Sequence, residues 1–186
     1  MALQRLKIDG YGQLEINFFT APRDGQIEAQ CKLNETDFAE KPAEVGMLLA
    51  VDNINRRVKL PVAGEPYPIA INYSTEHMYD ERKDALKNFH QTLNDFLPRM
   101  GYLNIGDKFH TNTICYDTDE FADDDTLKAA LKKDARLATP IYGGACELGA
   151  IKLSATQPTE GPVFMVIEDA TMPDGQYGVK IWCIKE

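Results

Sequence analysis

The sequence predicts an α+β fold that is mainly β, an antiparallel β-barrel or sandwich with two helices packed at its side. Three observations lead to this prediction. Short apolar stretches with two-residue alternation recur along the chain, turn-forming residues separate them, and helical spacing occurs in only two places. No repeat, low-complexity run or linker divides the chain. Residues 1–186 are therefore expected to form a single β-rich domain, with an N-terminal arm over residues 1–20 as an additional hypothesis.

The strands predicted in the first half differ in their apolar pattern. Residues 26–33 alternate, so their apolar side chains share one face. Residues 46–51 are continuously apolar, as in an inner strand, whereas residues 56–61 alternate and end at a proline, as in an edge strand. In order along the chain, the predicted elements are strands at residues 14–18, 26–33, 46–51, 56–61 and 67–73, with a turn at residues 22–25.

Two segments have helical spacing. Apolar side chains recur every three or four positions from Leu86 to Phe96, which predicts a helix over residues 80–96. A second, shorter helix is predicted after the acidic residues 123–125, because these acids precede apolar positions and lysines follow them. This charge order complements the helix dipole.

The stretch at residues 100–117 lies between the two predicted helices. Apolar residues flank Gly106 and Asp107, which predicts a hairpin around a tight turn. Residues 111–113 interrupt the alternation, so a bulge or a second bend is expected there.

The last third of the chain returns to strand patterns. Strands are expected at residues 139–142 and 148–153, on either side of a break at Gly143 and Gly144. The clearest hairpin joins residues 162–169 to residues 177–184 through the turn at residues 172–175. Both faces of its second strand carry apolar groups, so this strand is either buried on both sides or presents Trp182 to a partner.

Composition restricts the partners. The 29 acidic and 20 basic residues give a net charge of −9, which disfavours direct binding to nucleic acid. No apolar run approaches the roughly 20 residues of a membrane-spanning helix, and the N-terminus has no signal-peptide core, so a cytosolic product is expected. The four cysteines are far apart and form no C-x-x-C pair. They are expected to be buried and reduced, although disulfides remain open.

Candidate sites are weak. The acidic cluster could bind calcium, but its residues lack the spacing of a calcium-binding loop. Helix capping and a solvated face explain the cluster better. The histidines His77, His90 and His110 are expected in packing or on the surface. A nucleophile pair of Cys146 with His110 stays open, because such partners meet in space. No catalytic, cofactor-binding or metal-binding residue is assigned. The acidic cluster consists of Asp117, Asp119, Glu120, Asp123, Asp124 and Asp125.

Three glycines also fail to form a site. Gly143, Gly144 and Gly149 do not form the glycine-rich turn of a phosphate-binding loop. We expect them to occupy turns.

Several phrases together resemble structural proteins of tailed bacteriophages. They are RDGQIEAQ (residues 23–30), GMLLAVD (46–52), FLPRMGYL (96–103), GDKFHTN (106–112) and TMPDGQ (171–176). The resemblance implies a non-enzymatic virion protein of the capsid decoration or cement type, made in the host cytoplasm. Its implied partners are the major capsid protein and neighbouring copies of itself, in a homo-oligomer without nucleic acid or membrane. The resemblance carries over no functional residue.

Alternatives from other classes remain open. The chain could be a tail or connector component of the virion. A small-ligand or carbohydrate-binding β module would need Tyr67, Tyr73, Tyr142 and Trp182 to line one groove. A hydrolase would need a pocket in which His110 or a cysteine has a strongly perturbed pKa. A flat surface without a pocket would favour the structural role over both. Strand addition through the edge at residues 56–60 is a further hypothesis for assembly.

Overall fold

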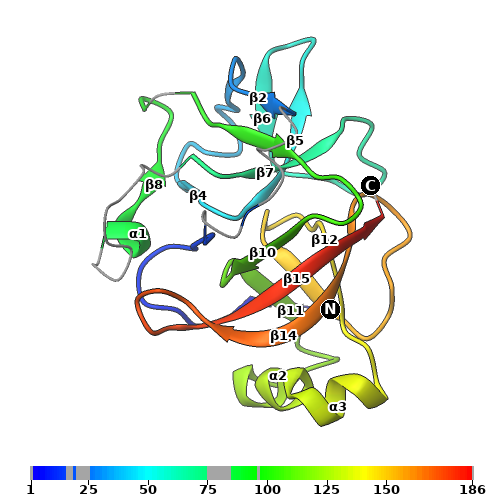
Figure 1. Cartoon of the computed structure of the whole chain (residues 1–186). Coiled ribbons are helices and arrows are strands. Elements are labelled where there is room, and N and C mark those ends of the chain that lie inside the picture. The colour runs from blue at the N-terminus through cyan, green and yellow to red at the C-terminus, as the bar shows by residue number, and fades with distance from the viewer. Residues whose placement is uncertain (1, 16–18, 20–25, 75–84, 96, 186) are drawn as a thin grey trace.

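The computed structural model describes residues 2–15, 19, 26–74, 85–95 and 97–185 (Figure 1). Its largest sheet has seven strands in the order β1-β11-β13-β12-β14-β15-β10. Their bounds are β1 (Leu3–Arg5), β10 (Lys108–Thr111), β11 (Ile114–Asp117), β12 (Tyr142–Gly144), β13 (Ile151–Ser154), β14 (Val163–Thr171) and β15 (Tyr177–Lys185).

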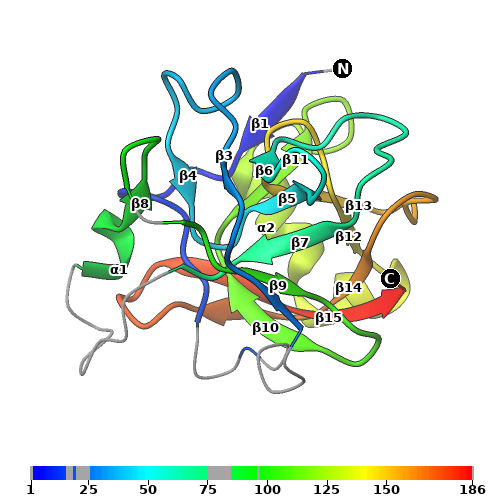
Figure 2. The ribbon, with the colours of Figure 1, turned by 90° about the horizontal axis from the view of Figure 1, so that it is seen from above.

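A six-stranded sheet lies above it in Figure 1, in the order β2-β9-β7-β5-β6-β3, and a short β4-β8 pair lies at its side. Figure 2 shows the same sheets from above. The bounds are β2 (Ile27–Glu28), β3 (Lys32–Leu33), β4 (Ala43–Glu44), β5 (Leu48–Asp52), β6 (Arg57–Lys59), β7 (Ile69–Asn72), β8 (His90–Gln91) and β9 (Met100–Tyr102).

The predicted fold class is confirmed, in the form of a sandwich rather than a closed barrel. Most strand pairs are antiparallel, but β11 pairs with β13 and β3 pairs with β6 in parallel. The main core lies between the sheets, where Leu48 and Ile71 share one buried cluster with Phe109, Phe164 and Ile181. A second cluster, which includes Phe38, covers the other face of the six-stranded sheet. This sheet is therefore buried on both faces.

The described residues contain three helices, one more than predicted: α1 (Ala85–Asn88), α2 (Asp124–Leu131) and α3 (Lys133–Ala138). The predicted second helix corresponds to α2. The Asp123 carboxylate caps it by accepting a hydrogen bond from the Thr126 N–H at 2.8 Å. Leu127 and Leu131 are buried and belong to the same apolar cluster, and α2 lies below β14 in Figure 1, so this cluster continues from the space between the sheets to the helix. No helix in the described ranges has the length and apolar character needed to cross a membrane.

The predicted helix over residues 80–96 is wrong in its second half, and its first residues, 80–84, lie outside the described ranges. The chain leaves the helix after Asn88, and β8 pairs with β4. Asp95 then accepts hydrogen bonds from the N–H and the hydroxyl of Thr92, which closes a turn. Leu93, predicted on the apolar stripe, is exposed. A local carboxylate and a distant strand therefore overrode the helical spacing.

The predicted central hairpin at residues 100–117 is also wrong. The tight turn exists, with Gly106 at φ +104°, but the strands on its two sides belong to different sheets. β9 pairs with β7 and β2, whereas β10 pairs with β15. The Gly106 N–H donates to the Cys183 carbonyl at 2.9 Å, which attaches the turn to β15. The turn thus carries the chain from one sheet to the other.

The second bend expected at residues 111–113 is present and separates β10 from β11. Thr111, Asn112 and Thr113 are fully buried although all three are polar. The Thr111 hydroxyl donates to the Gln13 carbonyl at 2.6 Å, and the Thr113 hydroxyl donates to the Val45 carbonyl at 2.6 Å. Asn112 accepts a hydrogen bond from the Gln13 N–H at 2.7 Å. This bend therefore connects the N-terminal segment and both sheets.

The C-terminal hairpin is confirmed and extends over β14 and β15. In its turn, Gly175 has φ +89°, which explains why a glycine follows Pro173 and Asp174. The hairpin at β5 and β6 is confirmed too. Asp52 closes its turn by accepting hydrogen bonds from the N–H groups of Ile54 and Asn55.

The strand predicted over residues 26–33 is broken. Only its ends form β2 and β3, and Ile27, predicted in the core, is exposed. β3 pairs with β6 along the side that was predicted to be an open edge. The open edge assumed for strand addition at residues 56–60 is therefore wrong at Arg57 and Val58, because β3 already pairs with them. The predicted turn at residues 22–25 lies outside the described ranges.

The described part of the first twenty residues is packed on the sheets. β1 pairs with β11, and Leu6 and Leu14 are buried. Arg5 forms a salt bridge with Glu44 at 2.8 Å. Of the strand predicted at residues 14–18, only Leu14 and Glu15 are described, and Leu14 forms an isolated bridge with Thr111.

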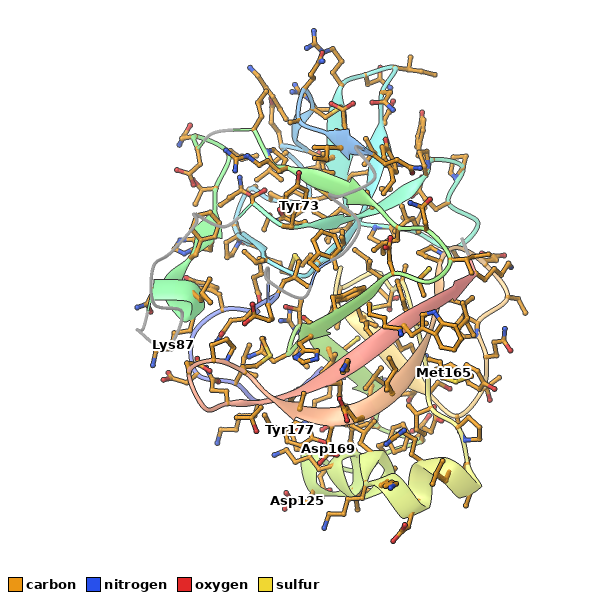
Figure 3. All side chains as sticks on the ribbon, in the orientation of Figure 1. Tyr73, Lys87, Asp125, Met165, Asp169 and Tyr177 are labelled. Carbon is orange, nitrogen blue, oxygen red and sulfur yellow. The ribbon has the colours of Figure 1, made fainter. Side chains whose placement is uncertain are left out.

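The side chain of Tyr177 supports one pH prediction (Figure 3). The hydroxyl has no hydrogen-bond partner among the described residues, and burial raises the pKa of Tyr177 to about 12. The folded state thus favours the neutral phenol, so this contribution to stability is complete below about pH 10 and is lost as the pH rises toward about 12. We expect Tyr177→Phe to unfold at higher urea than the wild type, by a margin that grows between pH 10 and pH 12. A margin that is constant with pH would contradict this assignment.

Candidate functional site

A cleft of about 540 Å³ opens on one side of the molecule, between the two sheets. The β6–β7 loop and the end of β9 form one wall, with Tyr67 and Tyr102. The β12–β13 loop and the start of β14 form the other wall, with Cys146, Lys152 and Pro162. The volume lies in the usual range for small-molecule sites. A surface without a pocket would have favoured a structural role over ligand binding and catalysis. Because this cleft is present, that argument for a structural role does not apply.

Most charged groups of the cleft already have partners within the protein. Glu65 accepts hydrogen bonds from backbone N–H groups of its own loop and lies 3.2 Å from the Lys59 amine. Glu160 accepts a hydrogen bond from the Gly64 N–H at 3.0 Å, which ties the two walls together. The Lys152 amine lies 3.7 Å from the Asp117 carboxylate. These contacts shape the cleft, so its carboxylates are not arranged as a cation site.

Two cysteine thiols meet at the back of this cleft. Cys115 lies on β11 and is fully buried, whereas Cys146 lies in the β12–β13 loop and is 8% exposed. Their Sγ atoms are 3.3 Å apart. A hydrogen bond from the Cys115 thiol, helped by the Leu148 N–H and by Lys152, lowers the pKa of Cys146. The same pairing, together with burial, raises the pKa of Cys115.

The outer face of the seven-stranded sheet carries a row of large side chains. The register places Tyr142 beside Met165, Met165 beside Trp182, and Trp182 beside Lys108, across β12, β14, β15 and β10. The Lys108 amine lies 5.9 Å from the centre of the Trp182 ring, and Trp182 is 37% exposed. Met165 lies near the right-hand end of the β14–β15 pair in Figure 3. We call these four residues the outer row.

The acidic cluster acts in local structure. Asp123 caps α2, and Asp124 accepts hydrogen bonds from the Tyr116 hydroxyl at 2.7 Å and the Lys7 N–H at 3.0 Å. Glu120 accepts a hydrogen bond from the Ala155 N–H at 2.5 Å. The capping interpretation is confirmed for Asp123. No group of three or more His, Cys, Asp and Glu side chains in the described ranges is placed to hold a metal ion.

The structure does not pair Cys146 with His110. Cys146 lies against Cys115 and the Ala150 carbonyl, whereas the charged groups around His110 are Lys180, Glu15 and Glu168. Burial lowers the pKa of His110. His90 stacks on Tyr11 with the ring centres 4.2 Å apart, as expected of a packing histidine. His77 lies outside the described ranges.

The glycines predicted as turn residues separate into two groups. Gly149 does occupy a turn, with φ +72°. Gly143 and Gly144 lie inside β12 instead, so the predicted break is wrong. A Cβ on Gly143 would come within 2.9 Å of the Ile151 side chain, and one on Gly144 within 2.7 Å of Pro158. Close packing of neighbouring chain segments therefore requires these glycines.

The four aromatic residues proposed for a carbohydrate groove do not come together. Tyr67 lines the cleft, Tyr73 packs on Phe19, and Tyr142 and Trp182 belong to the outer row. The sequence left open whether Trp182 is buried or presented to a partner, and it carried no signal for the thiol pair, whose members are 31 residues apart. Comparison of the chain with protein-family models, with curated proteins and with solved structures found no match.

Proposed function

We propose that the protein is a non-enzymatic structural component of a tailed-phage virion, of the capsid decoration type, and that it binds the major capsid protein through the outer row. The observation that carries the proposal is the outer row itself, a line of aromatic, thioether and lysine side chains on the outer face of the seven-stranded sheet. Tyr, Trp and Met are enriched in protein–protein interfaces. A rigid sheet presents them without a large ordering cost.

Charge supports the choice of partner. A net charge of −9 keeps the protein away from packaged DNA, while Lys108 in the outer row allows an acidic group on the shell to bind. Ile105, in the turn that leads from β9 into β10, is a further exposed apolar side chain three residues before Lys108. The proposal also includes contacts between neighbouring copies of the protein on the shell, which would form a homo-oligomer.

The resemblance to virion proteins points to no particular binding face. The phrases that carry it include β5, β9, β10 and the turn between β14 and β15. These segments build both sheets, so the phrases identify no surface. The binding face therefore has to be tested by substitution.

The test is binding of the purified protein to capsids that lack it, followed by size-exclusion chromatography with light scattering. We expect saturable binding in fixed stoichiometry, and an affinity loss of about tenfold or more for Trp182→Ala. Ile54→Ala is the matched control, because Ile54 is 83% exposed at the β5–β6 turn of the other sheet. It should bind as the wild type does.

Two results would contradict this proposal. If the wild type ignores capsids, the decoration role is rejected, and binding to purified tails or connectors tests the related virion role. If Trp182→Ala and Tyr142→Ala both bind capsids as the wild type does, the outer row is not the interface.

The cleft supports one competing function, the binding of a small ligand. Its volume and its Tyr67 and Tyr102 side chains are compatible with an aromatic or sugar-like ligand. A glycan and fragment screen with Tyr67→Ala as the comparison distinguishes the two functions. A ligand whose binding requires Tyr67, combined with no capsid binding, would favour this alternative.

A further inference from the structure

The thiol pair at the back of the cleft has the arrangement of a reactive dithiol. The Sγ atoms of Cys115 and Cys146 point toward each other at 3.3 Å, from strand β11 and from the β12–β13 loop. The other cysteines have different partners: the Cys31 thiol donates to the Asn53 amide oxygen, and the Cys183 thiol donates to the Lys185 carbonyl. All four cysteines are reduced in this structure.

We propose that Cys146 and Cys115 are a modification site, at which a small disulfide entering the cleft is reduced while the two thiols form an intramolecular disulfide. The inference does not depend on the capsid role. It rests on three observations: the contact between two sulfur atoms, the position of Cys146 on the cleft wall, and the complete burial of Cys115. Because Cys146 lines the cleft and Cys115 is buried behind it, the small disulfide reacts with Cys146 first and Cys115 reacts second.

Cys146 is the attacking thiol. It is the member of the pair that lines the cleft, so a reagent reaches it first. The hydrogen bond from Cys115 and the nearby Lys152 favour its thiolate, which is the nucleophilic form of cysteine. Cys115 retains its proton until the first bond has formed.

The chemistry balances in two exchange steps. The Cys146 thiolate attacks one sulfur of the small disulfide, forms a mixed disulfide and releases one small thiolate. Cys115 then loses its proton, attacks the Cys146 sulfur and expels the second small thiolate. Two protein thiols are oxidised, one small disulfide is reduced to two thiols, and the two protons end on these products.

The product would close a loop between residues 31 positions apart. For a chain of this size, a cross-link over such a loop is expected to raise the Tm by an amount on the order of 10 °C. The bond would fix the β12–β13 loop to β11 and thereby stiffen one wall of the cleft.

The experiment exposes the folded protein to oxidised glutathione and to the smaller hydroxyethyl disulfide, followed by acid quench, alkylation in denaturant and peptide mapping. We expect a Cys115–Cys146 linkage, loss of two hydrogen masses, and alkylation of Cys31 and Cys183 only. The variant Cys115→Ala should accumulate a mixed disulfide at Cys146, because the resolving thiol is gone. The double variant Cys31→Ala and Cys183→Ala should still form the linkage.

The wild-type measurement alone is decisive, so poor folding of a variant would not leave the proposal untested. A map without the Cys115–Cys146 linkage would overturn it. So would a linkage that forms only in denaturant, or native reaction at Cys146 no faster than at Cys31 and Cys183. A linkage formed natively and accompanied by a raised Tm supports it.

Discussion

Gly46→Ala is expected to lower the free energy of unfolding by about 3–5 kcal/mol. Gly46 has φ +85°, and a Cβ built there would lie 2.7 Å from the Thr113 hydroxyl and 2.8 Å from the Thr111 hydroxyl. Both hydroxyls are buried and donate to backbone carbonyls, so moving them removes the hydroxyl donor of the Val45 carbonyl and one of the two donors of the Gln13 carbonyl, which also accepts from the Asn112 N–H. The free energy lost with these hydrogen bonds adds to the strain of an alanine at a positive φ. Urea denaturation followed by circular dichroism measures it.

Gly175→Ala is the matched control for Gly46→Ala. Gly175 has nearly the same backbone angle, φ +89°, but a Cβ there would meet no atom within 4 Å. We expect a loss of about 1 kcal/mol, from backbone strain alone. Equal losses in the two variants would show that the contacts of Gly46 with the threonine hydroxyls do not matter.

Phe109→Ala is expected to cost about 3–5 kcal/mol, which is a large part of the stability of an ordinary domain. The Phe109 ring is fully buried and lies edge-on to two other rings, with centres 5.8 Å from Phe19 and 5.7 Å from Phe164. Removing it leaves a cavity where the two sheets meet. The midpoint of urea unfolding and the Tm both report the loss.

Two comparisons make the Phe109 result specific. Leu137→Ala on α3, where the side chain is 69% exposed, should change the stability by no more than about 0.5 kcal/mol. Phe109→Leu should lose less than Phe109→Ala because it leaves a smaller cavity. A loss below about 1 kcal/mol for Phe109→Ala would show that these rings do not hold the sheets together.

Local patterns predicted the parts of the fold that depend on neighbours in sequence. The β14–β15 hairpin combines long apolar runs with a Pro-Asp-Gly turn, and α2 combines a capping aspartate with ordered charges. Both contain their own start and stop signals within a few residues. The sequence therefore identified both elements, and it also identified the continuously apolar β5 as an inner strand.

The errors occur where distant segments decide the outcome. Residues on either side of Gly106 alternate as a hairpin would, but β7 pairs with one strand and β15 with the other. The helical spacing from Leu86 is overridden by pairing of β8 with β4. No local feature reports these pairings, so residue patterns alone cannot reveal them.

The candidate sites also depend on contacts between distant segments of the chain. The apolar groups on both faces of its strand left two possibilities, burial on both sides or presentation of Trp182 to a partner; Trp182 is 37% exposed, and the register adds Tyr142, Met165 and Lys108 from three other strands. The contact of Cys115 with Cys146 follows only from the packing of β11 against the β12–β13 loop. Neither the outer row nor the thiol pair has a spacing signature, since both are assembled across the sheet.

The pairing of β10 with β15 has a consequence for synthesis on the ribosome. β10 ends at Thr111, and its partner begins at Tyr177, so the partner is translated long after β10 has left the exit tunnel. During that interval the β10 edge lacks its final neighbour and is open to aggregation. Pairing over such sequence separations also slows folding, typically to milliseconds or seconds. A chaperone that shields unpaired strands is therefore expected to increase the yield of folded protein.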